Sequence, residues 1–157
     1  MNKLKLIVAD DQIEFLGGLV GKLKEVENFE IVGLAYNGED LLNLLNTTPA
    51  DIIITDNKMP KITGLEVIKE YVKGKTTLPL IYIISGDSIE RECLNLDISL
   101  IKKPISIDRI LDIIISDINE QPKEEDTNTV NQEIIPMKNE NLFKKFIKKI
   151  KQFIKQT

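Results

Sequence analysis

The chain has 157 residues, of which 42% are apolar and 29% are charged, and its formal net charge is −4 at pH 7. This composition is typical of a globular domain and excludes a fibrous or wholly disordered chain. The length suits one hydrophobic core with some chain left over, so a second full domain is not expected. Because Cys93 has no cysteine partner and no run reaches the roughly 18 apolar residues of a membrane-spanning helix, we expect a cytoplasmic protein.

Short runs of branched apolar residues alternate along the chain with longer amphipathic segments. The runs predict strands at Leu4–Ala9, Ile31–Ala35, Ile52–Thr55, Leu80–Ile84 and Ile98–Ile101. Helical spacing of apolar residues predicts helices at about 12–27, 38–47, 64–73, 88–95 and 106–119. Five such units predict an α/β fold with a parallel sheet covered on both faces, and the flavodoxin-like doubly wound sheet, with strand order 2-1-3-4-5, is the commonest arrangement.

Polar side chains follow four of the predicted strands, at the point where each strand ends. Asp10 and Asp11 follow the first strand, Asp56 the third and Ser85 the fourth, and Lys103 lies just beyond the fifth. In a parallel sheet these ends meet at one edge, where ligands bind. Three carboxylates at one edge repel one another, and a hard divalent cation with oxygen ligands relieves that repulsion. The sequence therefore predicts a Mg²⁺ site at this edge.

This set of residues is suited to phosphoryl transfer. A metal held by two carboxylates can neutralise a phosphate while the third carboxylate acts as the nucleophile, and Ser85 and Lys103 can supply the remaining donors. Each residue alone also has a simpler interpretation, as a helix cap at Asp10, Asp11 or Ser85, a turn at Asp56, or a solvated side chain at Lys103. Their occurrence at four separate strand ends, in this order, favours the phosphoryl-transfer interpretation.

Short sequence motifs surround these residues. They are Leu6–Asp11, Asp56–Pro60 with Gly64 soon after, Ile83–Gly86, and Lys103-Pro104. With them, the chain resembles the receiver domains of two-component response regulators over about residues 3–119. The resemblance implies a signalling protein that is not an enzyme beyond its own autocatalytic phosphorylation and dephosphorylation.

The resemblance implies a role for each site residue. Asp11 would be a direct ligand of Mg²⁺ and Asp10 would hold a metal-bound water, while Asp56 and the backbone carbonyl of Lys58 would complete the metal site. Asp56 would be the phosphoacceptor, and a histidine kinase or a phosphotransfer protein would supply the phosphoryl group.

Ser85 and Lys103 would serve the transferred phosphoryl group. The resemblance implies that Ser85 moves toward the phosphoryl oxygens and that Lys103 pairs with them. Lys103 is preferred to Lys102 because it directly precedes Pro104. In the family, the peptide bond between this lysine and the proline is commonly cis.

The chain departs from the family pattern at the fifth strand. An aromatic side chain that rotates on phosphorylation is usual three residues before the lysine, where this chain has Leu100. Leu100 could be core or surface packing, with switching left to Ser85 and to movement of a helix. The segment between Ser85 and Lys103 is also short, so the fourth helix is expected to be short or irregular, and the geometry of the output partner or of a homodimer cannot be transferred.

The two segments after residue 119 differ from each other in charge. Residues 120–141 are polar and acidic and predict a linker, whereas residues 142–157 carry six lysines and no acid and predict a basic amphipathic helix. Such a helix suits an anionic membrane surface, an acidic partner groove, or its own domain or a second copy. It is too short for a helix-turn-helix, so direct DNA binding is not expected.

Two competing functions follow from the same residues. One is a phosphorylation-independent interaction protein that acts through its basic tail at a membrane or a partner. The other is a metal-dependent phosphatase of similar shape, which is disfavoured because Lys58 stands where that class carries a second acid. The downstream partner of the signalling protein is not identified by the sequence.

Overall fold

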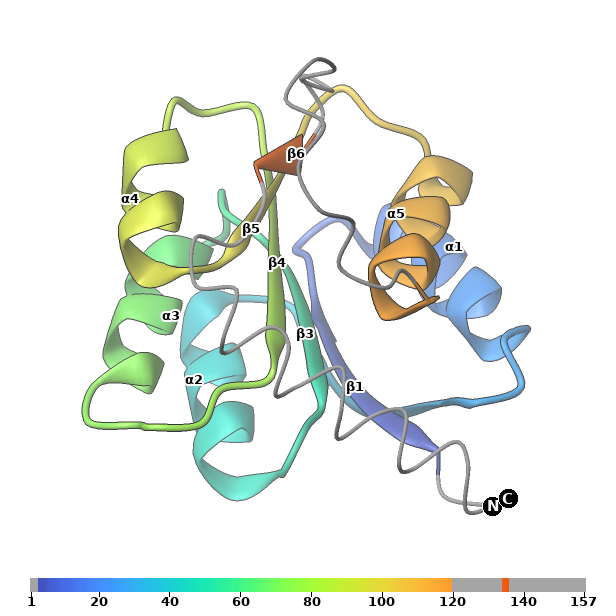
Figure 1. The fold of residues 1–157 in the computed structure, drawn as a ribbon, viewed down its shortest axis with the longest axis horizontal. Coiled ribbons are helices and arrows are strands. Elements are labelled where there is room, and N and C mark those ends of the chain that lie inside the picture. Colours follow the sequence, from blue (N-terminus) through green and yellow to red (C-terminus); the bar gives the residue numbers. More distant parts are fainter. Residues whose placement is uncertain (1–2, 120–133, 136–157) are drawn as a thin grey trace.

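The computed structural model describes residues 3–119 and the short strand 134–135, and the structural statements that follow concern this part of the chain. The basic segment 142–157 predicted to form a helix lies outside the described residues. Five parallel strands form the sheet in the order β2-β1-β3-β4-β5, which confirms the predicted doubly wound fold (Figure 1). Their bounds are β1 Leu4–Ala9, β2 Phe29–Ala35, β3 Ile52–Asp56, β4 Leu80–Ser85 and β5 Ser99–Lys102.

Five helices cover the two faces of the sheet. Their bounds are α1 Ile13–Lys24, α2 Gly38–Thr47, α3 Gly64–Val72, α4 Glu90–Leu96 and α5 Ile107–Asn119. Helices α1 and α5 pack on one face, and α2, α3 and α4 pack on the other (Figure 1). None of the helices described is long and apolar enough to cross a membrane.

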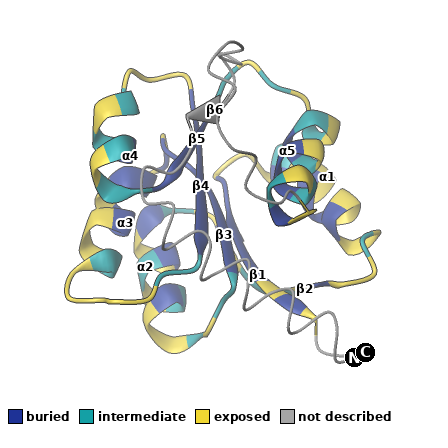
Figure 2. Ribbon diagram, viewed as in Figure 1, coloured by how far each residue is buried: buried dark blue, intermediate teal, exposed yellow. Residues whose placement is uncertain are grey.

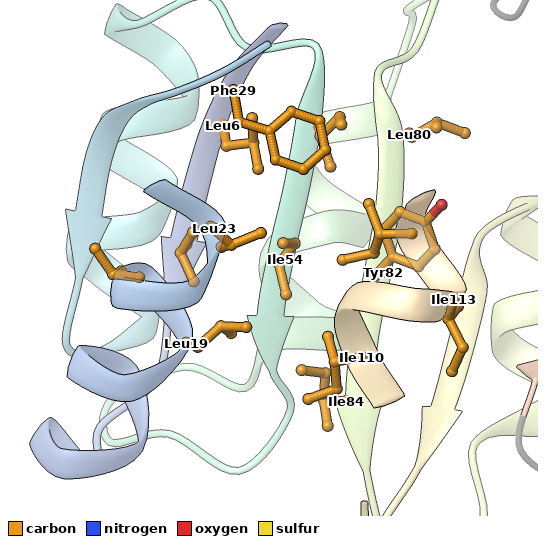
Figure 3. Packing of buried hydrophobic residues seen from close by; sticks show 14 of the residues in the cluster. Leu6, Leu19, Leu23, Phe29, Ile54, Leu80, Tyr82, Ile84, Ile110 and Ile113 are labelled. Atoms are coloured by element: carbon orange, nitrogen blue, oxygen red, sulfur yellow. The ribbon is translucent and has the colours of Figure 1, made fainter. Parts of the chain in front are cut away.

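The central strands are buried on both faces, because each strand sends alternate side chains into two hydrophobic clusters. In β3, Ile52 and Ile54 join the cluster beneath α1 and α5, whereas Ile53 joins the cluster beneath α2, α3 and α4. Figure 3 shows the first cluster, in which Ile54 lies among side chains from β1, β4, α1 and α5. Figure 2 shows the buried strands between helices whose outer faces are exposed. This packing fixes the strand ends that carry the polar residues.

Several element boundaries differ from the sequence prediction by one to three residues, and for two of them the structure shows the reason. Strand β2 begins at Phe29, two residues earlier than predicted, because Phe29 pairs with Leu4 of β1 and is buried beneath α1. Strand β5 begins one residue later than predicted. Helix α4 ends in a left-handed Asp97 with φ 60°, and the N–H of Ile98 still donates to the carbonyl of Cys93.

A sixth strand lies in the segment that the sequence pattern assigned to a linker. Strand β6, Ile134–Ile135, pairs antiparallel with Leu100 and Ile101 of β5 and lies beside α4 (Figure 1). The linker prediction was therefore wrong for these two residues. Two consecutive β-branched residues favour a strand, and β5 would otherwise present unpaired N–H and C=O groups at the edge of the sheet.

Candidate functional site

The carboxylate of Asp56 lies at the centre of the polar edge of the sheet. Asp56 is the last residue of β3, and its side chain is buried, with 3% of the residue exposed. The ammonium group of Lys103 donates to Asp56 Oδ1 at 2.5 Å. Lys103 Nζ also lies 5.8 Å from the centre of the Phe15 ring, so an aromatic face at the start of α1 contributes to its placement. The structure thus brings together the predicted nucleophile and the predicted lysine.

The two aspartates that follow β1 occupy different environments. Asp10 is buried and its Oδ1 accepts a hydrogen bond from the N–H of Gln12 at 2.8 Å, whereas Asp11 is exposed. Burial raises the pKa of Asp10, and the nearby charge of Asp56 adds to the rise, while the Gln12 hydrogen bond and Lys103 oppose it. The N-cap of α1 is Gln12, so neither aspartate is the cap that the simpler interpretation assumed.

The donor set at this edge fits the chemistry of Mg²⁺. Asp10, Asp11 and Asp56 offer carboxylate oxygens at neighbouring strand ends, because β1 pairs with β3 and Ala9 lies opposite Thr55. Lys58 is exposed two residues after Asp56, on the loop that leaves β3. Within residues 3–119, no three acidic, histidine or cysteine side chains converge closely enough to form a metal-binding group by themselves.

Ser85 lies at the same edge, but its hydroxyl is bonded elsewhere. Ser85 is the last residue of β4 and is buried, with 2% of the residue exposed. Its Oγ donates to Asp87 Oδ2 at 3.2 Å and accepts from the N–H of Asp87 at 3.0 Å. The N-cap of α4 is Ile89, so Ser85 is not a helix cap. In this conformation the predicted hydroxyl donor is present at the site without contacting Asp56.

The two lysines after β5 point to different partners. Lys103, which forms a cis bond to Pro104, reaches Asp56, and its N–H donates to the carbonyl of Ser85 at 3.0 Å. Lys102 instead donates to Glu90 Oε1 at 2.6 Å. Of these two lysines, Lys103 therefore contacts Asp56 and Lys102 contacts α4.

Two residues for which the sequence predicted no role, Asn57 and Gly64, hold the loop after β3 in place. Asn57 is buried, and its Oδ1 accepts from the N–H of Leu65 at 3.0 Å, which fixes the start of α3 next to Asp56. A Cβ at Gly64 would lie 2.2 Å from the carbonyl oxygen of Asp56, so no side chain fits there. Both residues lie in the motif Asp56–Pro60 with Gly64 soon after, but neither the hydrogen bond of Asn57 nor the closeness of Gly64 to Asp56 can be predicted from residue spacing.

Leu100 lies in the hydrophobic core. It is fully buried in the cluster beneath α2, α3 and α4 and pairs with Ile83 of β4. The core alternative for this position is thus confirmed. An aliphatic side chain with no exposed surface has no hydroxyl to move between solvent and core, so any switch in this chain must use other groups.

Comparisons with known proteins identify the family of the chain. The model of the response regulator receiver domain family matches residues 6–115. A protein-glutamate methylesterase/protein-glutamine glutaminase of Clostridium acetobutylicum is 33% identical over 126 residues, which cover 75% of this chain and 36% of that protein. Response regulator GacA of Pseudomonas aeruginosa is 30% identical over 80 residues, covering 51% of this chain and 37% of that protein. The chain thus spans little more than a third of the length of these curated relatives.

Solved structures share the fold. The isolated receiver domain of RcsB from Salmonella enterica serovar Typhimurium, in the presence of phosphomimetic BeF₃⁻, superposes with a TM-score of 0.63 at 26% identity, covering 73% of this chain and 88% of that one. The receiver domain of a regulator named NarL from Mycobacterium tuberculosis gives a TM-score of 0.65 at 22% identity and covers 74% of this chain and 96% of that one, a likeness of fold alone. With the family model matching most of its length, the chain belongs to the response regulator receiver domain family.

Proposed function

We propose that a histidine kinase or a phosphotransfer protein phosphorylates this receiver on Asp56, in a reaction that depends on Mg²⁺, and that the altered surface changes its binding to a downstream protein. The observation that carries the proposal is the buried Asp56 carboxylate, paired with Lys103 and lying close to the buried Asp10. A carboxylate oxygen at this position, next to the ammonium group of Lys103, is placed to act as a nucleophile toward a phosphoryl group.

The chemistry asked of the residues is a single displacement at phosphorus. A carboxylate oxygen of Asp56 forms a bond to phosphorus while the bond from phosphorus to the donor atom breaks, and the donor atom keeps the electron pair. Lys103, already bonded to Asp56, then pairs with the phosphoryl oxygens, and Ser85 can donate its hydroxyl hydrogen to one of them. Bound Mg²⁺ would supply further neutralisation of phosphoryl charge.

The metal would be held by the acidic edge of the sheet. Asp11, as the exposed acid, is suited to direct contact with the ion, and Asp10, as the buried acid, is suited to a water bound to it. Asp56 and the backbone carbonyl of Lys58 would complete the set. Removal of divalent ions with a chelator is expected to abolish phosphorylation without unfolding the protein, which circular dichroism can check.

The output of the domain is proposed to be a change in protein–protein contacts. The proposed receiver has no metabolic substrate, and its chemistry is limited to forming and hydrolysing its own acyl phosphate. The curated relatives are about three times longer than the matched region, so the activities in their names are not assigned to this chain. Direct DNA binding by this chain is not proposed, whereas a homodimer is compatible with the proposal.

Beryllofluoride, which was present with the RcsB neighbour, provides a direct test. Addition of beryllofluoride with Mg²⁺ is expected to shift the backbone amide spectrum of the wild-type protein around the ends of β3 and β4, and to leave Asp56→Asn unchanged. An unresponsive wild-type spectrum, in protein shown to be folded, would exclude phosphorylation at this site and would favour a phosphorylation-independent interaction protein.

The basic segment 142–157 is proposed separately to bring a cytoplasmic protein to an anionic membrane surface. Its six lysines and interspersed apolar residues are the basis of this proposal. Co-sedimentation with vesicles that contain anionic lipid, compared between the full chain and a variant without 142–157, tests it. If both sediment equally, the segment does not bind membranes, and a partner or its own domain remains as its binding site.

A further inference from the structure

The hydroxyl group of Ser85 is fully engaged by one neighbouring residue. Asp87 Oδ2 accepts its hydrogen at 3.2 Å, and the N–H of Asp87 donates to its oxygen at 3.0 Å. A serine hydroxyl carries a single hydrogen, so it cannot make a full hydrogen bond to Asp87 and to a phosphoryl oxygen at once. Ser85 must therefore release Asp87 before it can serve a group bound to Asp56.

The carboxylate of Asp87 is in turn held by Asn57. Asn57 Nδ2 donates to Asp87 Oδ2 at 2.9 Å, so the same carboxylate oxygen accepts from both Asn57 and Ser85. Asn57 is buried and its other side-chain atom, Oδ1, accepts from the N–H of Leu65. With both ends of its amide occupied, Asn57 is fixed in orientation and presents its donor to the loop after β4.

A second tie fixes the same loop to β5. Lys102 Nζ donates to the carbonyl of Asp87 at 2.9 Å and to Glu90 Oε1 at 2.6 Å. The hydrogen bonds from Asn57 and Ser85 also hold the pKa of Asp87 below its ordinary value, so its carboxylate is charged at neutral pH. The loop is thus bonded to the ends of β3, β4 and β5 at once.

We propose that Asp87, oriented by Asn57, is a positioning residue that holds the Ser85 hydroxyl away from the group bound to Asp56, and that breaking this clasp is a step of activation. The name clasp refers to Asn57, Ser85 and Asp87. The proposal rests on the proposed function and deepens it. It also gives this chain a switching element at the end of β4, where the buried Leu100 supplies none.

Asp87→Ala opens the clasp without removing a buried group, because Asp87 is exposed. Binding of beryllofluoride in the presence of Mg²⁺ is then measured by amide chemical-shift titration in the full chain. We expect the apparent Kd to fall about three- to tenfold, which is the scale of the net contribution of one ordinary hydrogen bond. An unchanged Kd would show that Asp87 does not restrain Ser85 and would overturn the proposal.

Removal of the negative charge of Asp87 would by itself strengthen the binding of anionic beryllofluoride, so the test needs two controls. Glu92→Gln removes one charge from α4, where Glu92 makes no hydrogen bond to the clasp, and we expect less than about a twofold change. In a Ser85→Ala background, Asp87→Ala is expected to give no gain beyond that of Glu92→Gln. If Asp87→Ala lowered the Kd equally with and without the Ser85 hydroxyl, the decrease would come from the lost charge alone, and this result would contradict the clasp.

Failure of the clasp and failure of the proposed function give different results. Absence of beryllofluoride binding in the wild type would refute the function itself. A second measurement needs no ligand, because the N–H of Asp87 donates to Ser85 in the free protein. We expect Ser85→Ala to speed hydrogen exchange at the Asp87 amide at least about fivefold over the rate in the wild type. Equal exchange rates in the two proteins would show that the hydrogen bond is not formed in solution.

Discussion

At the scale of single residues, the buried carboxylate of Asp10 lowers the stability of the folded protein. Its pKa is raised above 3.8 by burial and by Asp56, so the folded state holds the proton of Asp10 more tightly than the unfolded chain does. The free energy of unfolding therefore falls as the pH rises from 3.8 through the folded-state pKa of Asp10. A buried acid of this kind is retained at a cost in stability, as is common for functional groups.

Asp10→Asn is expected to recover that lost stability. The substituted amide keeps an oxygen that can accept from Gln12 and carries no charge, so we expect the free energy of unfolding at pH 7 to rise by about 1 kcal/mol. The gain should shrink as the pH falls from the folded-state pKa of Asp10 toward 3.8, and it should be absent below 3.8, where Asp10 is protonated in both states. Urea unfolding at several pH values measures this, with the exposed Asp11→Asn as the control. A pH-independent gain would contradict the assignment to the charge of Asp10.

Gly64 offers a second test at the scale of one residue. A Cβ there would lie 2.2 Å from the backbone oxygen of Asp56, so Gly64→Ala must displace either α3 or the end of β3, and we expect a loss of about 1–3 kcal/mol. Gly17→Ala is the matched control, since Gly17 lies in α1 with open space around it and should gain about 0.5–1 kcal/mol. Thermal unfolding compares the two. A Gly64→Ala protein as stable as the wild type would show that the close approach does not exist.

Sequence reasoning identified the groups of the site better than their contacts. Asp56 and Lys103 could be predicted because each closely follows a strand, and the sheet brings strand ends together. The bonds of Ser85 could not be predicted, because they depend on the path of the loop after β4 and on the orientation of Asn57. Hydrophobic periodicity carries no information about either.

At the scale of elements, the start of α3 is fixed by its own capping residues. Thr63 accepts from the N–H of Glu66, and Glu66 accepts in return from the N–H of Thr63. Thr63→Ala should lower the free energy of unfolding by about 1 kcal/mol. Thr63→Ser should lower it much less, because serine keeps the hydroxyl group of the cap. Chemical denaturation of the two variants checks this. Equal stability of both variants would show that the cap contributes nothing.

The elements themselves could be predicted in kind and order, and their ends less well. Continuous apolar runs and helical spacing indicated every strand of the parallel sheet and every helix that covers it. The start of β5 was misplaced by one residue, because the left-handed Asp97 and the bond from Ile98 back to Cys93 extend the end of α4. Strand β6 was missed because two apolar residues in a polar segment are too few to form a pattern.

At the scale of the whole molecule, the sheet has a parallel body and a short antiparallel addition. β6 covers the edge of β5 at Leu100 and Ile101. In a variant that ends at Asn119, the amides of β5 that do not bond to β4 should exchange with solvent faster, while those of β1 and β3 keep their protection. Hydrogen exchange followed by NMR measures this. Unchanged exchange throughout β5 would contradict the pairing with β6.

The central claim is that Asp56 accepts a phosphoryl group. The most direct test is the intact mass of the protein after incubation with Mg²⁺ and acetyl phosphate, compared with Asp56→Asn under the same conditions. We expect the wild type alone to gain the mass of one phosphoryl group and a chelator to prevent the gain. No gain in the folded wild type, or an equal gain in Asp56→Asn, would contradict the claim.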